Sequence, residues 1–336
     1  MKLLVIDGNS IVNRAFFGMH PLNNKEGFPT HAIFGFLNIL RRMERELEPD
    51  GICVTFDRRE PTFRHLAYEG YKAQRKGMPE DLAVQMPVLK EVLDALNIPR
   101  YELAGWEADD LIGTITRQCE QAGWDCRVAT GDRDALQLVS DQTYVELVTT
   151  RMGQTTTQEM DPAAFREKYG FAPAQMVDLK ALMGDASDNI PGVPGIGPKT
   201  ATKLLQTYGS MEGIYEHVGE LKGKQKENIE NNRETAFLSR EIATIVTDLD
   251  FPLDLEAVSF PAFDAAGVEE AFGKYQLASP LARVLAMIDA EPPSREAKLE
   301  VAPVLEGDAG AAEVARAVKA GETIGVAFVD PEQVSL

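Results

Sequence analysis

The stretch that organises this chain is Gly184-Asp185-Ala186-Ser187-Asp188-Asn189-Ile190-Pro191-Gly192-Val193-Pro194-Gly195-Ile196-Gly197-Pro198-Lys199-Thr200-Ala201. Its first half carries two carboxylates, and its second half is a Gly/Pro-rich turn that opens into an amphipathic helix predicted over Thr200–Tyr208. The glycines leave backbone N–H groups uncovered, and Lys199 and Lys203 lie at the helix N-terminus, which is the arrangement of an anion-binding site. The stretch therefore predicts metal ligands beside a phosphate clamp.

A nucleotide-binding P-loop is the rival interpretation of the second half. Residues Gly192 to Thr200 differ by one residue from the pattern G-x-x-x-x-G-K-[ST]. Pro198 is inserted before the lysine, and no buried strand is predicted in front of the loop. A nucleoside triphosphate site is therefore disfavoured.

Composition limits the class of protein. A chain of 336 residues predicts two or three domains. The three cysteines form no C-x-x-C motif and the four histidines are scattered, so neither a disulfide framework nor a zinc site is predicted. There is no run of eighteen apolar residues, and the chain enters a strand at once, which predicts a cytoplasmic protein with no signal peptide and no membrane partner. Nothing in the sequence indicates more than a monomer.

The net charge of −19 argues at first against a nucleic-acid partner. Many of the acids nevertheless fall into short clusters, and carboxylates that hold divalent cations are neutralised by them. The segment from Arg58 to Lys76 contains six Lys or Arg residues against two glutamates. It also mixes these cations with aromatic residues, which fits either a solvated loop or a site for single-stranded nucleic acid.

The first half of the chain predicts an α/β fold. Apolar strands are expected at Lys2–Ile6 and Gly51–Phe56, separated by an amphipathic helix over Thr30–Leu47. A further strand, Trp124–Thr130, is expected after a helix over Leu111–Ala122. This alternation indicates a parallel sheet, and ligands of such sheets bind outside the carboxyl ends of the strands.

The remaining expected elements are mostly helices. They are helices over Met86–Leu96, Ala174–Met183 and Arg233–Val246, two short helices within Val268–Ile288, a strand over Ile98–Leu103, a hairpin over Tyr144–Thr157 and a basic turn over Lys222–Lys226. From Asp161 onward the chain is expected to be helical.

Nine acids lie at predicted strand ends and turns: Asp7, Asp57, Glu107, Asp109, Asp110, Asp132, Asp134, Asp185 and Asp188. A single aspartate of this kind commonly caps a helix or makes a turn, and acids in a first helical turn suit the helix dipole. Nine at one sheet edge require shared cations, because clustered carboxylates raise one another's pKa. All-oxygen ligation selects Mg²⁺ or Mn²⁺, and two such ions hydrolyse phosphodiesters. The acids favour a metal-dependent nuclease or phosphatase, with other Mg²⁺ chemistry and purely structural acids as alternatives.

Several motifs together resemble a known family. They are Asp7-Gly8-Asn9-Ser10, Arg14-Ala15-Phe16-Phe17, Phe56-Asp57, Thr62-Phe63-Arg64, Tyr71-Lys72-Ala73-Gln74-Arg75, Glu107-Ala108-Asp109-Asp110, Thr130-Gly131-Asp132-Arg133-Asp134 and the opening stretch through Gly192. In order and spacing they resemble the 5′-nuclease domain of bacterial DNA polymerase I, a member of the flap endonuclease superfamily, from about Met1 to Ile288. The resemblance implies a PIN-like three-layer α/β/α core with a mostly parallel sheet at 1–170. It also implies a helical arch at about 62–90, followed by an all-α helix–3-turn–helix (SAM-like) DNA-binding region at 171–290.

The resemblance also implies roles for individual residues. The metal ligands would be Asp7, Glu107, Asp109, Asp110, Asp132, Asp134, Asp185 and Asp188, supported by Asp57, with Asp109, Asp110, Asp132 and Asp134 closest to two Mg²⁺ or Mn²⁺ ions. Lys72 and Arg75 would contact the scissile phosphate, and Tyr71 would be available to stack. The other implied DNA contacts are Arg14, Arg64, Gly192, Gly195, Gly197, Lys199, Thr200 and Lys203, with K⁺ at the helix–3-turn–helix.

The implied activity is removal of 5′ flaps and RNA primers at nicks and gaps in DNA. A non-catalytic duplex-binding module is the alternative, but such a module has no reason to keep acids that repel phosphate. A ribonuclease of the PIN-like toxin type shares the carboxylates and lacks the glycine-rich duplex clamp.

The C-terminal residues depart from the family pattern. Residues 291–301 are expected to form a linker, and 302–336 the start of a 3′–5′ exonuclease-like domain. The strand expected at Ile324–Phe328 lacks the Asp-x-Glu metal motif of active proofreading domains, and no polymerase motif is found. The chain is therefore expected to be an N-terminal portion of a polymerase I with an inactive second domain.

Overall fold

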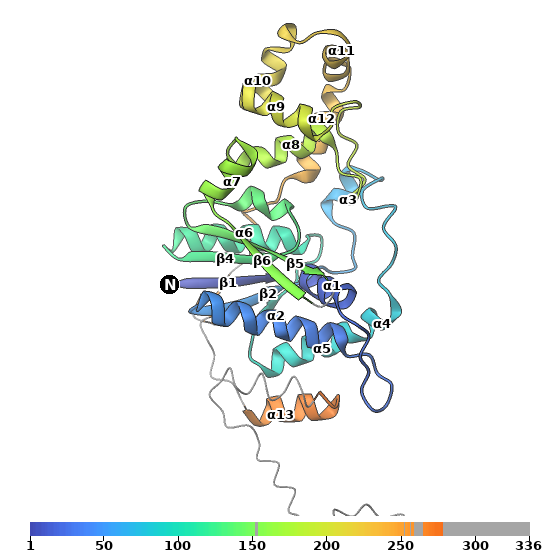
Figure 1. Ribbon diagram of the computed structural model, residues 1–336, viewed down its shortest axis with the longest axis vertical. Helices are drawn as coiled ribbons and strands as arrows, with labels where there is room; N and C mark the ends of the chain where they lie inside the picture. The colour runs from blue at the N-terminus through green and yellow to red at the C-terminus, as the bar shows by residue number, and fades with distance from the viewer. Residues whose placement is uncertain (152–153, 252, 256, 259–264, 278–336) are drawn as a thin grey trace, which may run out of the picture. The chain divides into compact units, whose positions relative to one another are not determined.

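The two central strands at Lys2–Asp7 and Gly51–Thr55 are short and mostly apolar, as expected where helices cover both faces of a sheet. The structure is a computed structural model that describes residues 1–151, 154–251, 253–255, 257–258 and 265–277 (Figure 1). The sheet has the order β3-β2-β1-β4-β5-β6. Its strands are β1 (Lys2–Asp7), β2 (Gly51–Thr55), β3 (Arg100–Tyr101), β4 (Asp125–Thr130), β5 (Thr143–Arg151) and β6 (Gln154–Met160). All neighbours pair in parallel except β5 and β6, which form the expected hairpin.

Register places the carboxyl ends of the central strands together. In the pairing of β1 with β2, Asp7 lies opposite Thr55, and in the pairing of β1 with β4, Ile6 lies opposite Ala129. Asp57 and Asp132 follow within a few residues of these positions. Strand register therefore brings the first of the expected acids to one edge of the sheet.

Side chains of β1 alternate between the two faces of the sheet. Leu3 and Val5 pack in the apolar cluster that contains residues of α6 (Ala108–Gln121), whereas Leu4 and Ile6 pack with residues of α1, α2 and α5. These helices are α1 (Gly8–Gly18), α2 (His31–Leu47) and α5 (Gln85–Ala95). Figure 1 shows α2 and α5 on one side of the sheet and α6 on the other. The predicted three-layer α/β/α core is confirmed.

The sheet is followed by a helical region, also as predicted. Its elements are α7 (Pro162–Tyr169), α8 (Met176–Met183), α9 (Pro198–Tyr208), α10 (Met211–Glu216), α11 (Gly223–Asn231), α12 (Arg233–Ala243) and the 3₁₀ helices η2 (Pro173–Gln175) and η3 (Val218–Glu220). Helix α9 begins two residues earlier than predicted, because Pro198 is favourable in a first helical turn. The basic segment predicted as a turn instead begins α11 at Gly223.

The segment expected to form a helical arch, at about 62–90, is helical only at its two ends. It holds α3 (Phe63–Ala67), α4 (Glu80–Ala83) and the first turns of α5, with turns and irregular chain over residues 68–79. The strand expected over Ile98–Leu103 is reduced to the two residues of β3 at the sheet edge. Its start is limited by Pro99, which has no backbone N–H to donate to a neighbouring strand.

Helix α13 (Ala265–Lys274) is the last described element, and Lys274 Nζ lies 2.6 Å from Glu91 Oε1 of α5. The predictions for residues 278–336, which include the linker at 291–301 and the strand at Ile324–Phe328, lie outside the described residues. Among the described helices, none has the length and apolar character needed to cross a bilayer.

Candidate active site

The first acid of the site, Asp7, is the last residue of β1 and is buried. One carboxylate oxygen accepts the Ser10 backbone N–H at 2.9 Å, which caps α1, and the other accepts the Thr130 hydroxyl at 2.6 Å. Burial raises the pKa of Asp7 from 3.8 to about 7, against these two hydrogen bonds, with Asp57 and Asp132 adding to the rise.

Asp109 lies in the first turn of α6 and is the least compensated acid of the site. Burial raises its pKa well above the ordinary value, and the charges of Asp7, Asp132 and Asp134 raise it further. No hydrogen-bond or ion-pair partner of its carboxylate is found among the described residues. A partly buried oxygen-only group surrounded by like charges fits a hard divalent cation. The donor set therefore fits Mg²⁺ or Mn²⁺.

Asp134, Asp185 and Asp188 form a second group of acids next to these. Each offers a carboxylate oxygen, and the three oxygens lie within 4.8 Å of one another, close enough to share a metal ion. Asp134 begins the 3₁₀ helix η1 (Asp134–Leu138), and its backbone N–H donates to Asp132 at 3.0 Å. Asp185 and Asp188 come from the stretch after α8, so this stretch ties the helical region to the sheet edge.

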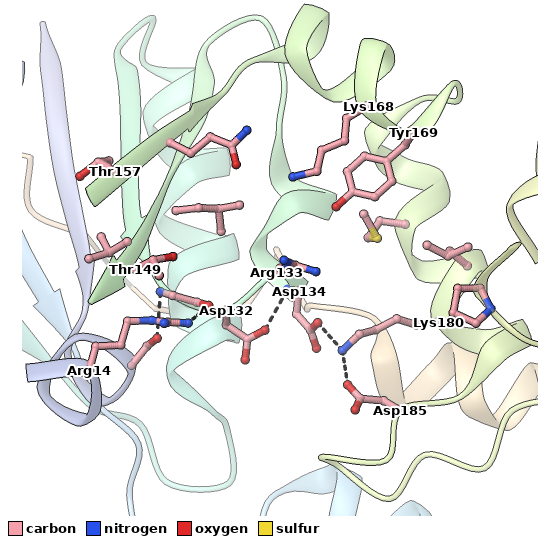
Figure 2. Close-up of a pocket in the computed structure, with 18 of the residues that line it drawn as sticks. Arg14, Asp132, Arg133, Asp134, Thr149, Thr157, Lys168, Tyr169, Lys180 and Asp185 are labelled. Atoms are coloured by element: carbon pink, nitrogen blue, oxygen red, sulfur yellow. Dashed lines mark hydrogen bonds and ion pairs between the residues drawn. The ribbon is translucent and has the colours of Figure 1, made fainter. Parts of the chain in front are cut away.

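Lys180 is a site residue that sequence analysis missed. Its ammonium group pairs with Asp134 and lies 2.6 Å from Asp185 (Figure 2). Burial raises the pKa of Asp134 to about 7 although Lys180 opposes this. For Asp185, the lysine and Ser187 outweigh the effect of burial and lower the pKa to about 2. The sequence does contain a signal for this residue, because Lys180 stands between the apolar residues Leu179 and Ala181 of α8.

Asp110 is predicted to lie among the acids closest to the metal ions, and in this structure its carboxylate is held by an arginine. Its carboxylate is fully buried and accepts hydrogen bonds from both terminal nitrogens of the Arg64 guanidinium, at 2.6 and 2.7 Å. It also accepts the backbone N–H groups of Glu107 and Val246, at 3.1 and 3.0 Å. Both oxygens are therefore occupied by donors from the protein.

The same ion pair corrects the prediction that Arg64 contacts DNA. Its side chain is 3% exposed, and its remaining N–H groups donate to the carbonyls of Ile242 and Thr244, both at 2.8 Å. Arg64 and Asp110 thus join α3, α6 and the end of α12, which is a structural role.

The cations predicted to contact the scissile phosphate are held by acids at the edge of the site. Lys72 Nζ lies 2.8 Å from Glu107, and Arg75 pairs with Asp188. Lys72 has a left-handed backbone (φ 53°), and its N–H donates to the Asp188 carbonyl at 2.9 Å. Tyr71 was predicted to be available for stacking, but it is buried, with its hydroxyl 2.9 Å from Glu107. In this structure Tyr71 holds Glu107 instead of presenting its ring.

Asp57, expected to support the ligand set, is partly buried beside it. Its two oxygens accept the Ala108 backbone N–H at 2.8 Å and the Asn9 side chain at 2.9 Å. Burial raises its pKa, and the Ala108 hydrogen bond and Lys72 lower it. Asp57 therefore connects the end of β2 to the starts of α1 and α6, which is the arrangement of a supporting residue.

A cavity of about 1060 Å³ adjoins the acids, with Asp132 and Asp134 on one wall. Figure 2 shows Lys168 and Tyr169 of α7 across this cavity from them. Arg14 of α1 also lines it and donates to the Gly131 carbonyl. A Cβ on Gly131 would lie 1.3 Å from Arg14 Nε, so glycine is required there for Arg14 to take this position.

The three glycines of the predicted phosphate clamp differ in their environment. Gly192 is buried, its N–H donates to Ser239 at 3.1 Å, and a Cβ on it would lie 2.2 Å from the Gly184 nitrogen. Gly192 therefore serves packing, and in this structure its N–H group, which was predicted to contact DNA, is bonded to Ser239 instead. Gly195 and Gly197 are exposed before α9. Lys199, Thr200 and Lys203 follow, the two lysines exposed, and line a surface groove with α11.

The pKa values of Asp7 and Asp134 predict a pH dependence of stability. Both rise from 3.8 to about 7 in the folded protein, so between these values the folded protein binds more protons than the unfolded chain. The free energy of unfolding then falls as pH rises through this window. Asp185, with its pKa lowered to about 2, loses its stabilising effect only at a lower pH, as pH falls from 3.8 through 2.

We expect the melting temperature in EDTA to fall from about pH 5 to about pH 7.5, and to fall less in saturating Mg²⁺, which favours ionised carboxylates. Differential scanning fluorimetry in both buffers measures this. Parallel profiles with and without Mg²⁺ would contradict a metal site at these acids.

Two sequence families cover most of the chain. The family described as 5′-3′ exonuclease, N-terminal resolvase-like domain, matches residues 2–170, and 5′-3′ exonuclease, C-terminal SAM fold, matches residues 171–266. DNA polymerase I of Bacillus caldotenax is 45% identical over 272 residues, and that of Bacillus subtilis (strain 168) is 43% identical over 264. These alignments cover 81% and 78% of this chain but only 31% and 30% of the two polymerases. The chain thus spans about a third of these relatives.

Solved structures share the fold at lower sequence identity. The structure described as divalent metal ions (zinc) bound to bacteriophage T5 5′-exonuclease has a TM-score of 0.60 and 22% identity, and covers 84% of this chain and 100% of that protein. A bacteriophage T5 flap endonuclease in complex with DNA and metal ions has a TM-score of 0.58 and 22% identity, with 86% and 100% coverage. These similarities support the arrangement of the sheet and of the helical region.

Proposed function

Because this chain belongs to the 5′-3′ exonuclease family, found at the N-terminus of DNA polymerase I, we propose that it hydrolyses phosphodiesters at 5′ flaps, nicks and RNA primers of DNA. The observation that carries this proposal is the carboxylate of Asp109, which lies among Asp7, Asp132 and Asp134 and has no partner in the part of the chain that the structure describes. A protein that only binds duplex DNA gains nothing from an uncompensated acid cluster, since it repels phosphate. The acids therefore favour catalysis over the alternative of a non-catalytic binding module.

We assign the metal ligands to the acids that are not held by a buried arginine in a two-point ion pair. They are Asp7, Asp109, Asp132, Asp134, Asp185 and Asp188, with Asp57 and Glu107 in support. Two divalent ions, Mg²⁺ or Mn²⁺, would activate water and neutralise charge on the scissile phosphate. Asp110 is not among the ligands, because Arg64 occupies its carboxylate.

The cations at the edge of the site position the scissile phosphate in this proposal. Lys72 and Arg75 are held by Glu107 and Asp188, so a phosphate that approaches the acids meets two cations already fixed in place. Arg75 is the more accessible, with 48% of its side chain exposed. Fixed cations reduce the entropy that is lost when substrate binds.

The duplex next to the cleaved bond would lie against the N-terminus of α9. Gly195 and Gly197 are exposed there, and Lys199 and Lys203 lie in the first two turns of the helix. Exposed N–H groups and lysines at a helix N-terminus bind backbone phosphate without reading sequence. K⁺ held by carbonyl groups of this turn is part of the proposal.

Replacing Lys199 by alanine is expected to weaken duplex binding equally for all sequences. One lost phosphate contact lowers the slope of log K against log salt by about one unit. Fluorescence anisotropy in Ca²⁺ over a range of KCl measures the slope. Lys25→Ala is the matched control, because Lys25 is an exposed lysine between α1 and α2. An unchanged slope in Lys199→Ala would remove Lys199 from the interface.

The proposed activity is tested with three 5′-labelled DNA substrates, namely a 5′ flap, a 3′ flap and a blunt duplex. In Mg²⁺ we expect cleavage at the base of the 5′ flap, and no cleavage of any substrate in EDTA. Equal cleavage of the 5′ and 3′ flaps would contradict structure-specific recognition. Duplex binding without cleavage of any substrate in Mg²⁺ or Mn²⁺ would favour the binding module.

A further inference from the structure

A second, smaller cavity of about 250 Å³ lies beside the active site and has no assigned role. Asp57, Lys72 and Glu107 line it on the side of the active site, whereas Asp132 and Asp134 line the large cavity instead. Its outer wall is the loop after β2, which carries Arg58 and Arg59, together with Trp106. The cavity thus opens from the edge of the site where the phosphate-positioning cations lie.

The charges of the outer wall fit a phosphate. Arg58 and Glu60 pair at 2.6 Å and compensate each other. Arg59 is exposed and, among the described residues, its side chain has no ion-pair or hydrogen-bond partner. An arginine that is free at the mouth of a cavity presents its N–H groups to a phosphate oxygen.

The rings that line the cavity are held in place by their neighbours. Trp106, which is partly exposed, packs against Phe63 of α3 with ring centroids 5.1 Å apart. The His65 ring is fixed by the Thr62 hydroxyl at 2.9 Å and by an edge contact with Tyr71 at 5.2 Å. Aromatic faces beside a cation are the usual platform for an unpaired base.

The dimensions exclude a duplex. The cavity is smaller than the roughly 300–1,000 Å³ of sites that enclose a drug-sized ligand. A base within a duplex presents only its edge in the grooves, so a base that stacks on Trp106 is either unpaired or in the last pair of a duplex, and a base pair is larger than one base in a cavity of about 250 Å³. One nucleotide of a single strand fits the volume of the cavity, its base can stack on Trp106, and its phosphate can pair with Arg59.

We propose that this cavity binds one nucleotide of the displaced 5′ strand, with its base against Trp106 and its phosphate on Arg59. The assignment rests on the proposed nuclease function and adds to it a subsite for the single-stranded side of the cleaved bond. Trp106 directly precedes Glu107, so a base on Trp106 lies one residue from the group that holds Lys72.

The test pairs a change in the protein with a change in the DNA. Short 5′ flaps carry an abasic residue at one flap position at a time, and single-turnover cleavage in Mg²⁺ is measured for wild type, Trp106→Ala and Trp106→Phe. Loss of a base stack is expected to slow Trp106→Ala by about 5- to 150-fold on the intact flap. At one flap position the abasic residue should slow the wild type and remove the difference from Trp106→Ala.

Trp106→Phe separates stacking from folding, because it keeps an aromatic ring against Phe63. We expect it to restore most of the cleavage rate and to show the same position-specific loss with the abasic residue. If Trp106→Ala is as fast as wild type, or is slowed by the same factor on every abasic substrate, the subsite is wrong.

Arg59 is tested by its salt dependence. Arg59→Ala should lower the salt slope for binding the flap substrate in Ca²⁺ by about 0.7 unit, the value for one single-strand phosphate, and leave binding of a blunt duplex unchanged. Arg117→Ala, at an exposed position of α6, is the matched control and should leave both unchanged. Equal losses for flap and duplex in Arg59→Ala would overturn the assignment.

The experiments distinguish an error in the assignment of the subsite from an error in the proposed nuclease function. A wild-type protein that cleaves no flap contradicts the nuclease function, and the subsite is then decided by binding alone. In a Trp124→Phe background, Trp106 is the single tryptophan, and a single-stranded oligonucleotide is expected to quench its fluorescence. Absence of quenching at saturating oligonucleotide overturns the subsite.

Discussion

Replacing Asp109 by asparagine is expected to slow cleavage strongly and at the same time to stabilise the metal-free protein. The carboxylate lies among Asp7, Asp132 and Asp134 without a partner among the described residues, and burial and these charges raise its pKa. Asparagine removes the repulsion, and the melting temperature in EDTA should rise by roughly 2–4 °C for each kcal/mol relieved. Loss of a metal ligand should lower single-turnover cleavage by about three orders of magnitude, or about 4 kcal/mol.

Measuring both the cleavage rate and the melting temperature distinguishes the loss of a metal ligand from a general loss of stability. Mg²⁺ should raise the melting temperature of Asp109→Asn less than that of wild type, because one charge that the ion neutralises is gone. Asp141→Asn, at an exposed aspartate before β5, should change neither cleavage nor melting temperature. Cleavage at the wild-type rate would mean that Asp109 is not a ligand. A lower melting temperature in EDTA would contradict the repulsion inferred from its neighbours.

Replacing the next residue, Asp110, by asparagine is expected to have the opposite effect on stability. The change leaves Arg64 buried at 3% exposure without its bidentate carboxylate. Breaking a buried ion pair by removal of one partner costs about 3–5 kcal/mol. Urea unfolding in EDTA measures the loss, and Mg²⁺ should not restore it, because Asp110 is not a ligand in this assignment.

A double variant provides the control for Asp110. Arg64→Met combined with Asp110→Asn removes the stranded cation, so the double variant should be more stable than the sum of the two single changes predicts. If Asp110→Asn unfolds at the wild-type urea concentration, the ion pair does not support the fold. If its loss of stability is reversed by Mg²⁺, Asp110 is a ligand after all.

Asp109 and Asp110 are adjacent in sequence, but only Asp110 pairs with a buried arginine. The sequence alone did not predict this difference. Glu107-Ala108-Asp109-Asp110 begins a helix, and the sequence predicted that these acids contact metal. The direction of each side chain depends on what packs against that turn of α6. Arg64 reaches Asp110 from 46 residues away, together with the backbone of Val246 from 136 residues away. No local pattern predicts contacts at such separations.

The same limit explains the other corrections. Tyr71 was predicted to present its ring, and burial with its hydroxyl on Glu107 removes that ring from solvent. Gly192 was predicted to expose its N–H, which instead donates to Ser239 of α12. Lys180 was missed because its importance lies in the acids around it, Asp134 and Asp185, which come from different segments.

Local patterns in the sequence were enough to predict the α/β core, the helical region that follows and the gathering of acids at one sheet edge. Their physical basis is periodicity and register, since parallel strands that end in Asp7 and near Asp57 and Asp132 must bring those residues together. Tertiary structure alone decided which acids pair with a cation of the protein: Asp110 pairs with Arg64, Glu107 with Lys72, and Asp134 and Asp185 with Lys180, whereas Asp109 has no such partner among the described residues. The reason is that charge compensation in a buried site depends on long-range packing, which the spacing of residues along the chain does not contain.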